Sequence, residues 1–259
     1  MERQKNTSLL WDTQVWTDIP TEKEDKYRIE FEKKSIQWKR IKKTVLKEFG
    51  SFKNLKTIEI GAGRGTYSLL FALNGAEVTI LDYSQKAIDS SKLFFERNGI
   101  KANFITMDAL KIDENFAGKY DLSMSFGTAE HFLGEKRINF IKSHFDVLRK
   151  GGITFICVPN KWNPPYSVWK FLSERMGRWK FGEEYPFSVL EFKKIQKKIR
   201  KKFKYEGVSL FDTPFNILER IDSFFGFKEQ YNLKNIHRHI GTPLDGYFSR
   251  TIMAVGKNN

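Results

Sequence analysis

The sequence predicts an α/β domain in which helices cover both faces of a doubly wound, mostly parallel sheet. Three observations support this fold class. Short strand-like segments alternate with helical segments over the first 160 residues, a glycine-rich turn follows the first strand, and an acidic residue ends the second. The connections between these segments are short, which is typical of strand–helix–strand units.

The elements are expected in a regular order from residue 27 to residue 158. Apolar residues recur at spacings of three, four and seven over 27–49, which predicts one amphipathic helix. Ser84 is a helix-capping residue, and Gly99 is a stop signal for the helix that Ser84 begins. The expected strands are 55–60, 77–81, 103–107, 120–126 and 153–158, and the helices between them are 66–73, 84–98 and 135–149.

The last hundred residues are less regular. A segment rich in Pro and Trp precedes a basic helix over 188–203, and the elements expected after it are a strand at 205–211, a helix near 215–225 and a strand at 248–255. Long loops in compact domains often cover a site. We therefore expect residues 1–50 to be an N-terminal helical extension and lid, and residues 51–259 to be the main domain, with lid insertions at about 159–187 and 212–246.

Charge and cysteine content restrict the class of protein. The formal net charge is +14, and half of it lies in residues 191–205, which hold eight basic residues and one acid. Because the positive charge is concentrated in one segment, it argues against a nucleic-acid-binding surface. Two interpretations of the segment remain, a solvated helix face or peripheral contact with an anionic membrane or phosphate groups. Cys157 is the single cysteine, and no signal peptide or membrane-spanning run is evident, which predicts a cytoplasmic protein.

The most informative motif is Ile58–Thr66, which reads IEIGAGRGT. Its glycines leave the backbone bare where a strand turns into a helix, so a polar or anionic ligand can approach the main chain. Asp82 ends the next strand, where an acid accepts hydrogen bonds from ribose hydroxyls. The dinucleotide fingerprint requires a glycine at position 66, which is threonine here, so NAD is the weaker candidate.

The ordered set EIGAGRG, Val78–Ser84 (VTILDYS) and Met107–Leu110 (MDAL) resembles the class I S-adenosylmethionine-dependent methyltransferases. Within them it is most similar to the branch of the ubiquinone and menaquinone methyltransferases and of many sugar and natural-product O-methyltransferases. The resemblance covers about residues 55–160. It implies a Rossmann-like fold with seven strands, S-adenosylmethionine as the methyl donor, S-adenosylhomocysteine as the product, and a small-molecule acceptor methylated at a hydroxyl oxygen.

The resemblance also implies roles for individual residues. Glu59 and the glycines would hold the methionine part of the cofactor, Asp82 would hold both ribose hydroxyls, and Tyr83 would pack on the adenine. Asp108 would accept from the adenine amino group. The complete set assigned to the cofactor is Glu59, Gly61, Ala62, Gly63, Gly65, Asp82, Tyr83, Met107, Asp108, Ala109 and Phe126.

Glu130 and His131 follow the fourth strand and match a Glu-His pair common in that branch. We predict that this pair is catalytic, with His131 as the general base, because imidazole titrates near neutral pH. Some related enzymes add a metal held by this pair and by a carboxylate three residues earlier. Position 127 is glycine here, so no metal is predicted.

Two further features have competing interpretations. Asn163–Tyr166 spells NPPY, a signature of amino-methylating enzymes, but it follows the fifth strand and not the fourth, so we interpret it as a turn. Tryptophans could cover the acceptor as a lid, and these are Trp11, Trp16, Trp162, Trp169 and Trp179. Three alternatives remain open, namely a lipid or quinone methyltransferase that docks on membranes, a nucleic-acid methyltransferase, and a catalytically silent partner of another subunit.

Overall fold

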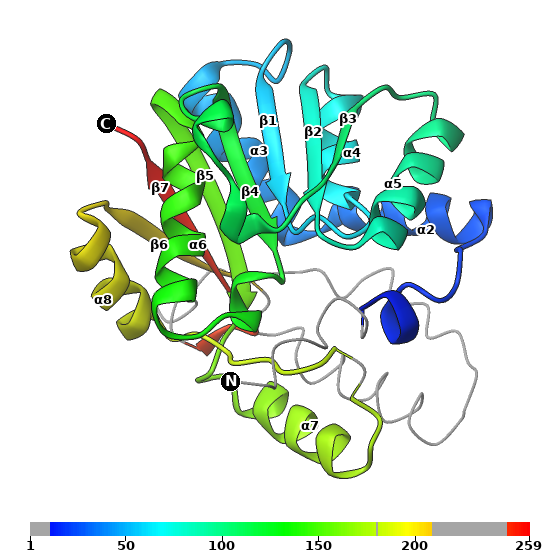
Figure 1. The fold of residues 1–259 in the computed structure, drawn as a ribbon, viewed down its shortest axis with the longest axis vertical. Helices are drawn as coiled ribbons and strands as arrows, with labels where there is room; N and C mark the ends of the chain where they lie inside the picture. The colour runs from blue at the N-terminus through cyan, green and yellow to red at the C-terminus, as the bar shows by residue number, and fades with distance from the viewer. Residues whose placement is uncertain (1–10, 180, 209–247) are drawn as a thin grey trace.

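The computed structural model describes residues 11–179, 181–208 and 248–259. At its centre is a seven-stranded sheet with the strand order β3-β2-β1-β4-β5-β7-β6 (Figure 1). The first five strands pair in parallel, and β7 runs antiparallel to both β5 and β6. The predicted fold class is thereby confirmed. The strands are β1 (Lys56–Ile60), β2 (Glu77–Asp82), β3 (Asn103–Thr106), β4 (Tyr120–Phe126), β5 (Leu148–Pro159), β6 (Phe203–Val208) and β7 (Thr251–Lys257).

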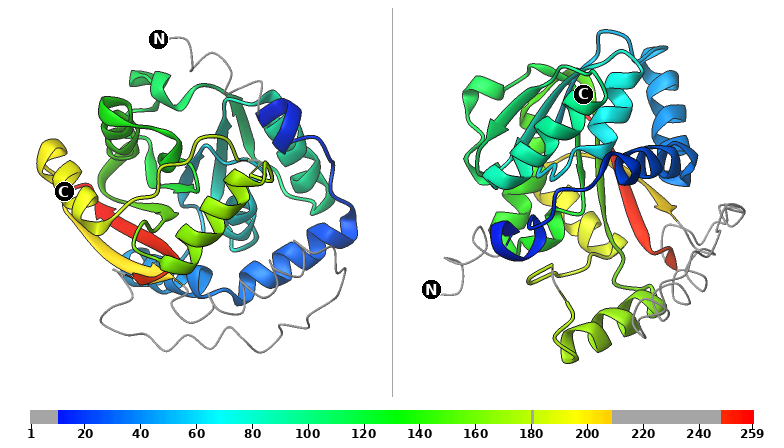
Figure 2. Two further views of the ribbon diagram at one scale, coloured as in Figure 1. Left: turned by 90° about the horizontal axis from the view of Figure 1, so that it is seen from below. Right: turned by 90° about the vertical axis from the view of Figure 1, so that its right-hand side faces the viewer.

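Helices cover both faces of this sheet (Figures 1 and 2). One apolar cluster joins α3 (Ile36–Phe49), α4 (Thr66–Leu73) and α5 (Gln85–Arg97) to one face, and a second joins α6 (Gly134–Asp146) and α8 (Val189–Ile199) to the other. The other helical elements are η1 (Trp11–Val15), α2 (Glu22–Lys34), η2 (Ala109–Lys111), η3 (Glu114–Phe116), η4 (Ala129–His131) and α7 (Pro164–Arg175). In the described part of the chain, no helix is long and apolar enough to cross a bilayer.

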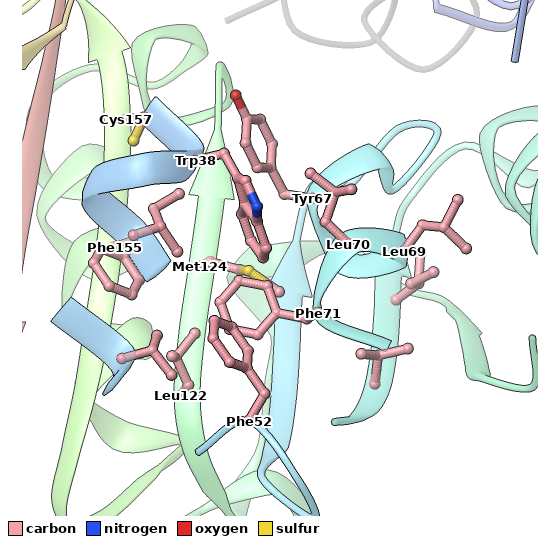
Figure 3. Close-up of a cluster of buried hydrophobic side chains, with 14 of the residues drawn as sticks. Trp38, Phe52, Tyr67, Leu69, Leu70, Phe71, Leu122, Met124, Phe155 and Cys157 are labelled. Atoms are coloured by element: carbon pink, nitrogen blue, oxygen red, sulfur yellow. The ribbon is translucent and has the colours of Figure 1, made fainter. Parts of the chain in front are cut away.

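Aromatic packing fixes the N-terminal helices on the sheet. The Trp38 ring of α3 lies 5.7 Å from the Phe52 ring and 5.5 Å from the Phe71 ring, measured between centroids. Figure 3 shows these three rings together above β1 and β4. Because buried aromatic residues contribute large apolar areas, this cluster holds α3 on the face of the sheet.

The N-terminal helix is divided where we expected one continuous helix. Ser35 is extended, with ψ 150°, and its hydroxyl accepts a hydrogen bond from the backbone N–H of Trp38. A serine side chain that caps a helix competes with helix continuation. The single helix predicted over 27–49 is therefore wrong, and two helices, α2 and α3, occupy residues 22–49.

Two predicted helix ends also shift, and one segment expected to be a loop contains a helix. The helix expected to end at Arg149 ends at Asp146, because β5 already begins at Leu148. The basic helix expected to reach residue 203 ends at Ile199, since Arg200 is left-handed with φ 54°. The segment 159–187, expected to be a loop, contains α7, which is capped by Asn163 and begins with two prolines at positions that tolerate them. The helix near 215–225 and the insertion at 212–246 lie outside the described residues.

Candidate active site

The crevice between β1 and β4 is where this fold places a ligand. The strand order reverses at this pair, since β2 and β3 lie on one side of β1 while β5 lies beyond β4. The helices that follow the two strands, α4 and α6, pack on opposite faces of the sheet. In open α/β sheets, ligands bind outside the carboxyl ends of the strands at such a reversal.

The glycine turn at the end of β1 consists of bare backbone. Gly61, Gly63 and Gly65 have φ values of 69°, 54° and 69°, which other residues rarely adopt. A Cβ atom on Gly61 would lie 2.3 Å from the Cγ2 atom of Thr128, so that position has no room for a side chain. Because α4 begins directly after the turn, its N-terminus favours polar or anionic groups there.

Asp82 lies beside this turn and is held by two backbone amides. Its Oδ2 atom accepts a hydrogen bond from the N–H of Gly63 at 2.8 Å, and its Oδ1 atom accepts one from the N–H of Ser84 at 2.9 Å. Burial raises the pKa of the carboxyl, and the two amide donors oppose that rise. An ionised carboxylate has about four lone-pair sites, so Asp82 can accept further donors from a ligand.

The residues assigned to the adenine side come together around Asp82. The N–H of Met107 donates to the carbonyl of Asp82 at 2.8 Å, and the Asp108 carboxylate caps η2 by accepting from Leu110 at 2.9 Å. Burial, followed by the charges of nearby carboxylates including Asp82 and Asp108, raises the pKa of Tyr83. The glycine turn, the end of β2 and the residues after β3 thus lie side by side, although they are separate in the sequence.

Glu59, predicted to hold the methionine part of the cofactor, lies on β1 next to the glycine turn. Its Oε2 atom accepts from the backbone N–H of Ser68 at 3.1 Å and from the Ser68 hydroxyl at 2.6 Å. Burial raises its pKa to about 7, although the two hydrogen bonds from Ser68 act to lower it. The carboxyl therefore braces α4 against β1, and it would be readily ionised by a cationic group placed beside it.

A cavity of about 170 Å³ lies on the other side of the strand ends. An apolar cavity near this size can hold a single benzene-sized ring. Its walls come from the ends of β4 and β5, from α3 and α7, and from Arg250 and Thr251 at the start of β7. The lining residues are Gln37, Phe126, Gly127, Glu130, Cys157, Val158, Pro159, Tyr166, Arg250 and Thr251.

Glu130 gives this cavity an unusual carboxyl group. The side chain is buried, and within the described residues its Oε2 atom has no hydrogen-bond partner. Burial, and then the charge of Glu184, raises the pKa of Glu130 well above its ordinary range. A buried polar atom without a partner is costly, so a ligand that offers a hydrogen bond to Glu130 would be stabilised.

Tyr166 lines this cavity, and neither Tyr166 nor its partner Glu184 is in the predicted site. The Tyr166 hydroxyl donates to the Glu184 carboxylate. The Asn163 amide, in contrast, is used within the fold, since it caps α7 through the N–H of Tyr166 at 2.9 Å and donates to the carbonyl of Phe248 at 2.8 Å. The NPPY motif is therefore the start of α7 and not the turn that we expected, and its tyrosine lines the cavity.

His131 lies next to Glu130 but does not line the cavity. Its Nδ1 atom is 2.9 Å from the carbonyl oxygen of Glu183, so Nδ1 carries the proton and Nε2 has the free lone pair. Burial lowers the pKa of the imidazole, which keeps it neutral and able to accept a proton. The ring of Trp11 meets it edge-on, with the centroids 5.1 Å apart.

Comparisons with known proteins agree with this geometry. Residues 58–152 match a family model described as a methyltransferase domain. A ubiquinone biosynthesis O-methyltransferase of Pelagibacter ubique is 29% identical over 136 residues, which are 49% of this chain and 53% of that protein. The chain spans about half the length of the curated relatives it matches.

Solved structures share the fold over most of the chain. Magnesium protoporphyrin IX methyltransferase from Synechocystis PCC 6803, solved with bound S-adenosylhomocysteine, gives a TM-score of 0.55 at 15% identity and covers 83% of this chain and 79% of its own. A SAM-dependent methyltransferase from Archaeoglobus fulgidus gives 0.52 at 15% identity and covers 85% and 93%. With the strand order and the glycine turn beside Asp82, these matches show that residues 58–152 are a methyltransferase domain of the class I, S-adenosylmethionine-dependent type.

Proposed function

We propose that the chain is an S-adenosylmethionine-dependent methyltransferase that methylates a hydroxyl oxygen of a small-molecule acceptor. The observation that carries this proposal is the Asp82 carboxylate, fixed by the Gly63 amide of a turn with three glycines at positive φ. The names of the relatives, O-methyltransferases of ubiquinone biosynthesis, favour oxygen as the methylated atom. They do not favour the nucleic-acid alternative.

The residues of the crevice fit this cofactor. The turn ends at the N-terminus of α4, which favours polar or anionic groups, Asp82 has lone pairs to spare for two ribose hydroxyls, and Glu59 suits a cationic amine. Ala62, Met107, Ala109 and Phe126 lie on the segments that carry these groups. When bound, S-adenosylmethionine supplies an electrophilic methyl group.

The protein's own part in the reaction is to orient the acceptor and to receive its proton. Glu130 holds the acceptor's hydroxyl group in the cavity by a hydrogen bond. His131 is the predicted base, with its tautomer fixed by the Glu183 carbonyl; since its ring does not line the cavity, the proton would have to reach Nε2 from the acceptor held at Glu130. Among the described residues, no three His, Cys, Asp or Glu side chains form a group that could hold a metal ion.

The experiment uses S-adenosylmethionine labelled in the methyl group, incubated with the purified chain and an extract of metabolites and lipids. We expect label in an acceptor with the wild type and at most background label with Asp82→Ala. Label in the organic phase would identify a lipid or quinone acceptor, and label in the aqueous phase a polar one. If the wild type binds no S-adenosylhomocysteine in calorimetry and transfers no label, the proposed function is wrong.

We also propose peripheral contact of α8 with anionic membrane surfaces or phosphate groups. Phe192 and Ile195 of this helix are buried against the sheet, so its lysines face outward. The basic segment 191–205 begins in α8 and continues into β6, so most of its positive charge lies in one region of the structure. Sedimentation with vesicles containing anionic lipid tests this contact, and binding that disappears at high salt is the expected result.

A further inference from the structure

Residues 11–21, here called the arm, lie across the strand ends on the cofactor side. The indole of Trp16 is so close to the glycine turn that a Cβ atom on Gly63 would lie 2.8 Å from its Cζ2 atom. Asp12 accepts a hydrogen bond from the Ser84 hydroxyl, and its carbonyl accepts one from Lys86 at 2.8 Å. In Figure 1, η1 and α7 lie on the same side of the sheet, beyond its strand ends.

The arm therefore touches the surroundings of the predicted cofactor residues. Trp16 covers the turn that contains Gly63, and Asp12 pairs with the residue that donates its N–H to Asp82. The charge of Asp12 contributes to the raised pKa values of Asp82 and Tyr83, which places its carboxylate near both. Neither Trp16 nor Asp12 lines the acceptor cavity.

A buried ion cluster fastens the end of the arm. Asp25, in the first turn of α2, pairs with Arg64 of the glycine turn, and its other oxygen accepts from Arg97 at 2.9 Å. Arg97 also donates to the carbonyl of Pro20, the residue before the end of the arm, at 2.6 Å. One carboxylate thus holds together the start of α2, the glycine turn and α5. Removal of one member of a buried ion pair leaves a charge without compensation, so Asp25 controls this junction.

We propose that the arm is the outer wall of the cofactor site, that Trp16 and Asp12 position the cofactor against the glycine turn, and that Asp25 holds the arm in place. The inference rests on the proposed function and assigns the N-terminal lid to the cofactor, where the sequence suggested the acceptor. The cofactor can then enter or leave its site only when the arm moves away from the glycine turn.

The first test measures binding of S-adenosylhomocysteine to the full chain by calorimetry. Truncating a large packed aromatic residue removes a substantial contact, so Trp16→Ala is expected to raise the Kd by about tenfold. Trp16→Phe keeps an aromatic ring and should restore part of the affinity, which a general loss of stability would not predict. Tyr27→Ala is the matched control, because this α2 side chain is 69% exposed and should leave the Kd unchanged.

The second test follows chymotrypsin cleavage after Trp16. S-adenosylhomocysteine should slow this cleavage in the wild type, and Asp25→Asn should speed it at equal ligand occupancy. This measurement tests the position of the arm in the wild-type chain, so it remains valid even if Trp16→Ala fails to fold. Tight binding by the wild type, with an unchanged Kd in Trp16→Ala or cleavage that the ligand does not alter, overturns the arm proposal alone. If the wild type does not bind at all, the proposed function and the arm proposal are both wrong.

Discussion

The carboxylate of Asp82 accepts a hydrogen bond from the backbone amide of Gly63 at 2.8 Å, which ties the end of β2 to the turn after β1. Because a second amide, that of Ser84, fixes the other oxygen, the carboxylate cannot rotate freely. A group held in place before the ligand arrives loses little entropy on binding. This pair is therefore the geometric centre of the proposed cofactor site.

Asp82→Asn should weaken S-adenosylhomocysteine binding. Both oxygens of Asp82 accept from backbone N–H groups, and the amide nitrogen of asparagine cannot accept, so one contact becomes a repulsion. Hydrogen bonds to charged groups contribute about 1.5–3 kcal/mol, so we expect the Kd to rise by roughly tenfold to hundredfold in calorimetry. Asp89→Asn on the exposed side of α5 is the control. An unchanged Kd for Asp82→Asn would remove Asp82 from the site.

Gly61→Ala and Gly99→Ala separate steric exclusion from backbone strain. Both glycines have similar positive φ values, 69° and 66°. A Cβ atom on Gly61 would lie 2.3 Å from Thr128, whereas one on Gly99 would meet nothing within 4 Å. Gly99→Ala should therefore cost about 1–2 kcal/mol of unfolding free energy from strain alone, and Gly61→Ala should cost more and also abolish cofactor binding. Urea denaturation and calorimetry measure the two effects. Equal stability losses would show that the turn adjusts to the extra methyl group.

The cofactor side could be predicted because its residues are tied to strand ends. The spacing from the glycine turn to Asp82 and then to Asp108 follows from one strand–helix–strand unit after another, and the structure brings these residues together. The fold class was confirmed for the same reason. The roles of the individual site residues stay predictions.

The contacts of the acceptor side and of the arm could not be predicted as well from the sequence. Tyr166 and Glu184 meet across a turn of the chain after α7, and Trp16 reaches Gly63 from another part of the chain. No local period encodes such contacts, since they depend on how an insertion and an extension pack on the sheet. Ser35 was misjudged for a different reason, because a serine inside an apolar period fits either a helix interior or a cap.

The pH dependence of stability should contain a contribution from Glu59. Burial raises its pKa from 4.5 to about 7 in the folded protein, so the folded state binds this proton more tightly than the unfolded state does. The stabilisation is complete below pH 4.5 and is lost as pH rises through 7. Glu59→Gln cannot titrate, so its free energy of unfolding relative to that of the wild type should increase over this window by on the order of 3 kcal/mol. Urea denaturation of the cofactor-free proteins at several pH values measures the difference. A constant difference between the two proteins would mean that folding does not change the pKa of Glu59.

Tyr166→Phe should reduce methyl transfer without weakening cofactor binding. The substitution removes the hydroxyl that donates to Glu184, so this carboxylate loses a donor beside the cavity that Glu130 lines. We expect kcat/KM for the acceptor to fall by about tenfold, which corresponds to one hydrogen bond of ordinary strength. The Kd of S-adenosylhomocysteine should stay within twofold of the wild type, because Tyr166 lines the acceptor cavity and not the glycine turn.

Tyr205→Phe is the matched control for this substitution. It also removes one phenol hydroxyl, which lies 3.1 Å from the Gln196 side chain, but at the packing of β6 on α8 and outside the cavity. Both variants should lose about 1 kcal/mol of unfolding free energy, and only Tyr166→Phe should lose activity. Equal activity in the two variants would show that the Tyr166–Glu184 pair supports the insertion alone, and the acceptor would then be held by Glu130 without help from α7.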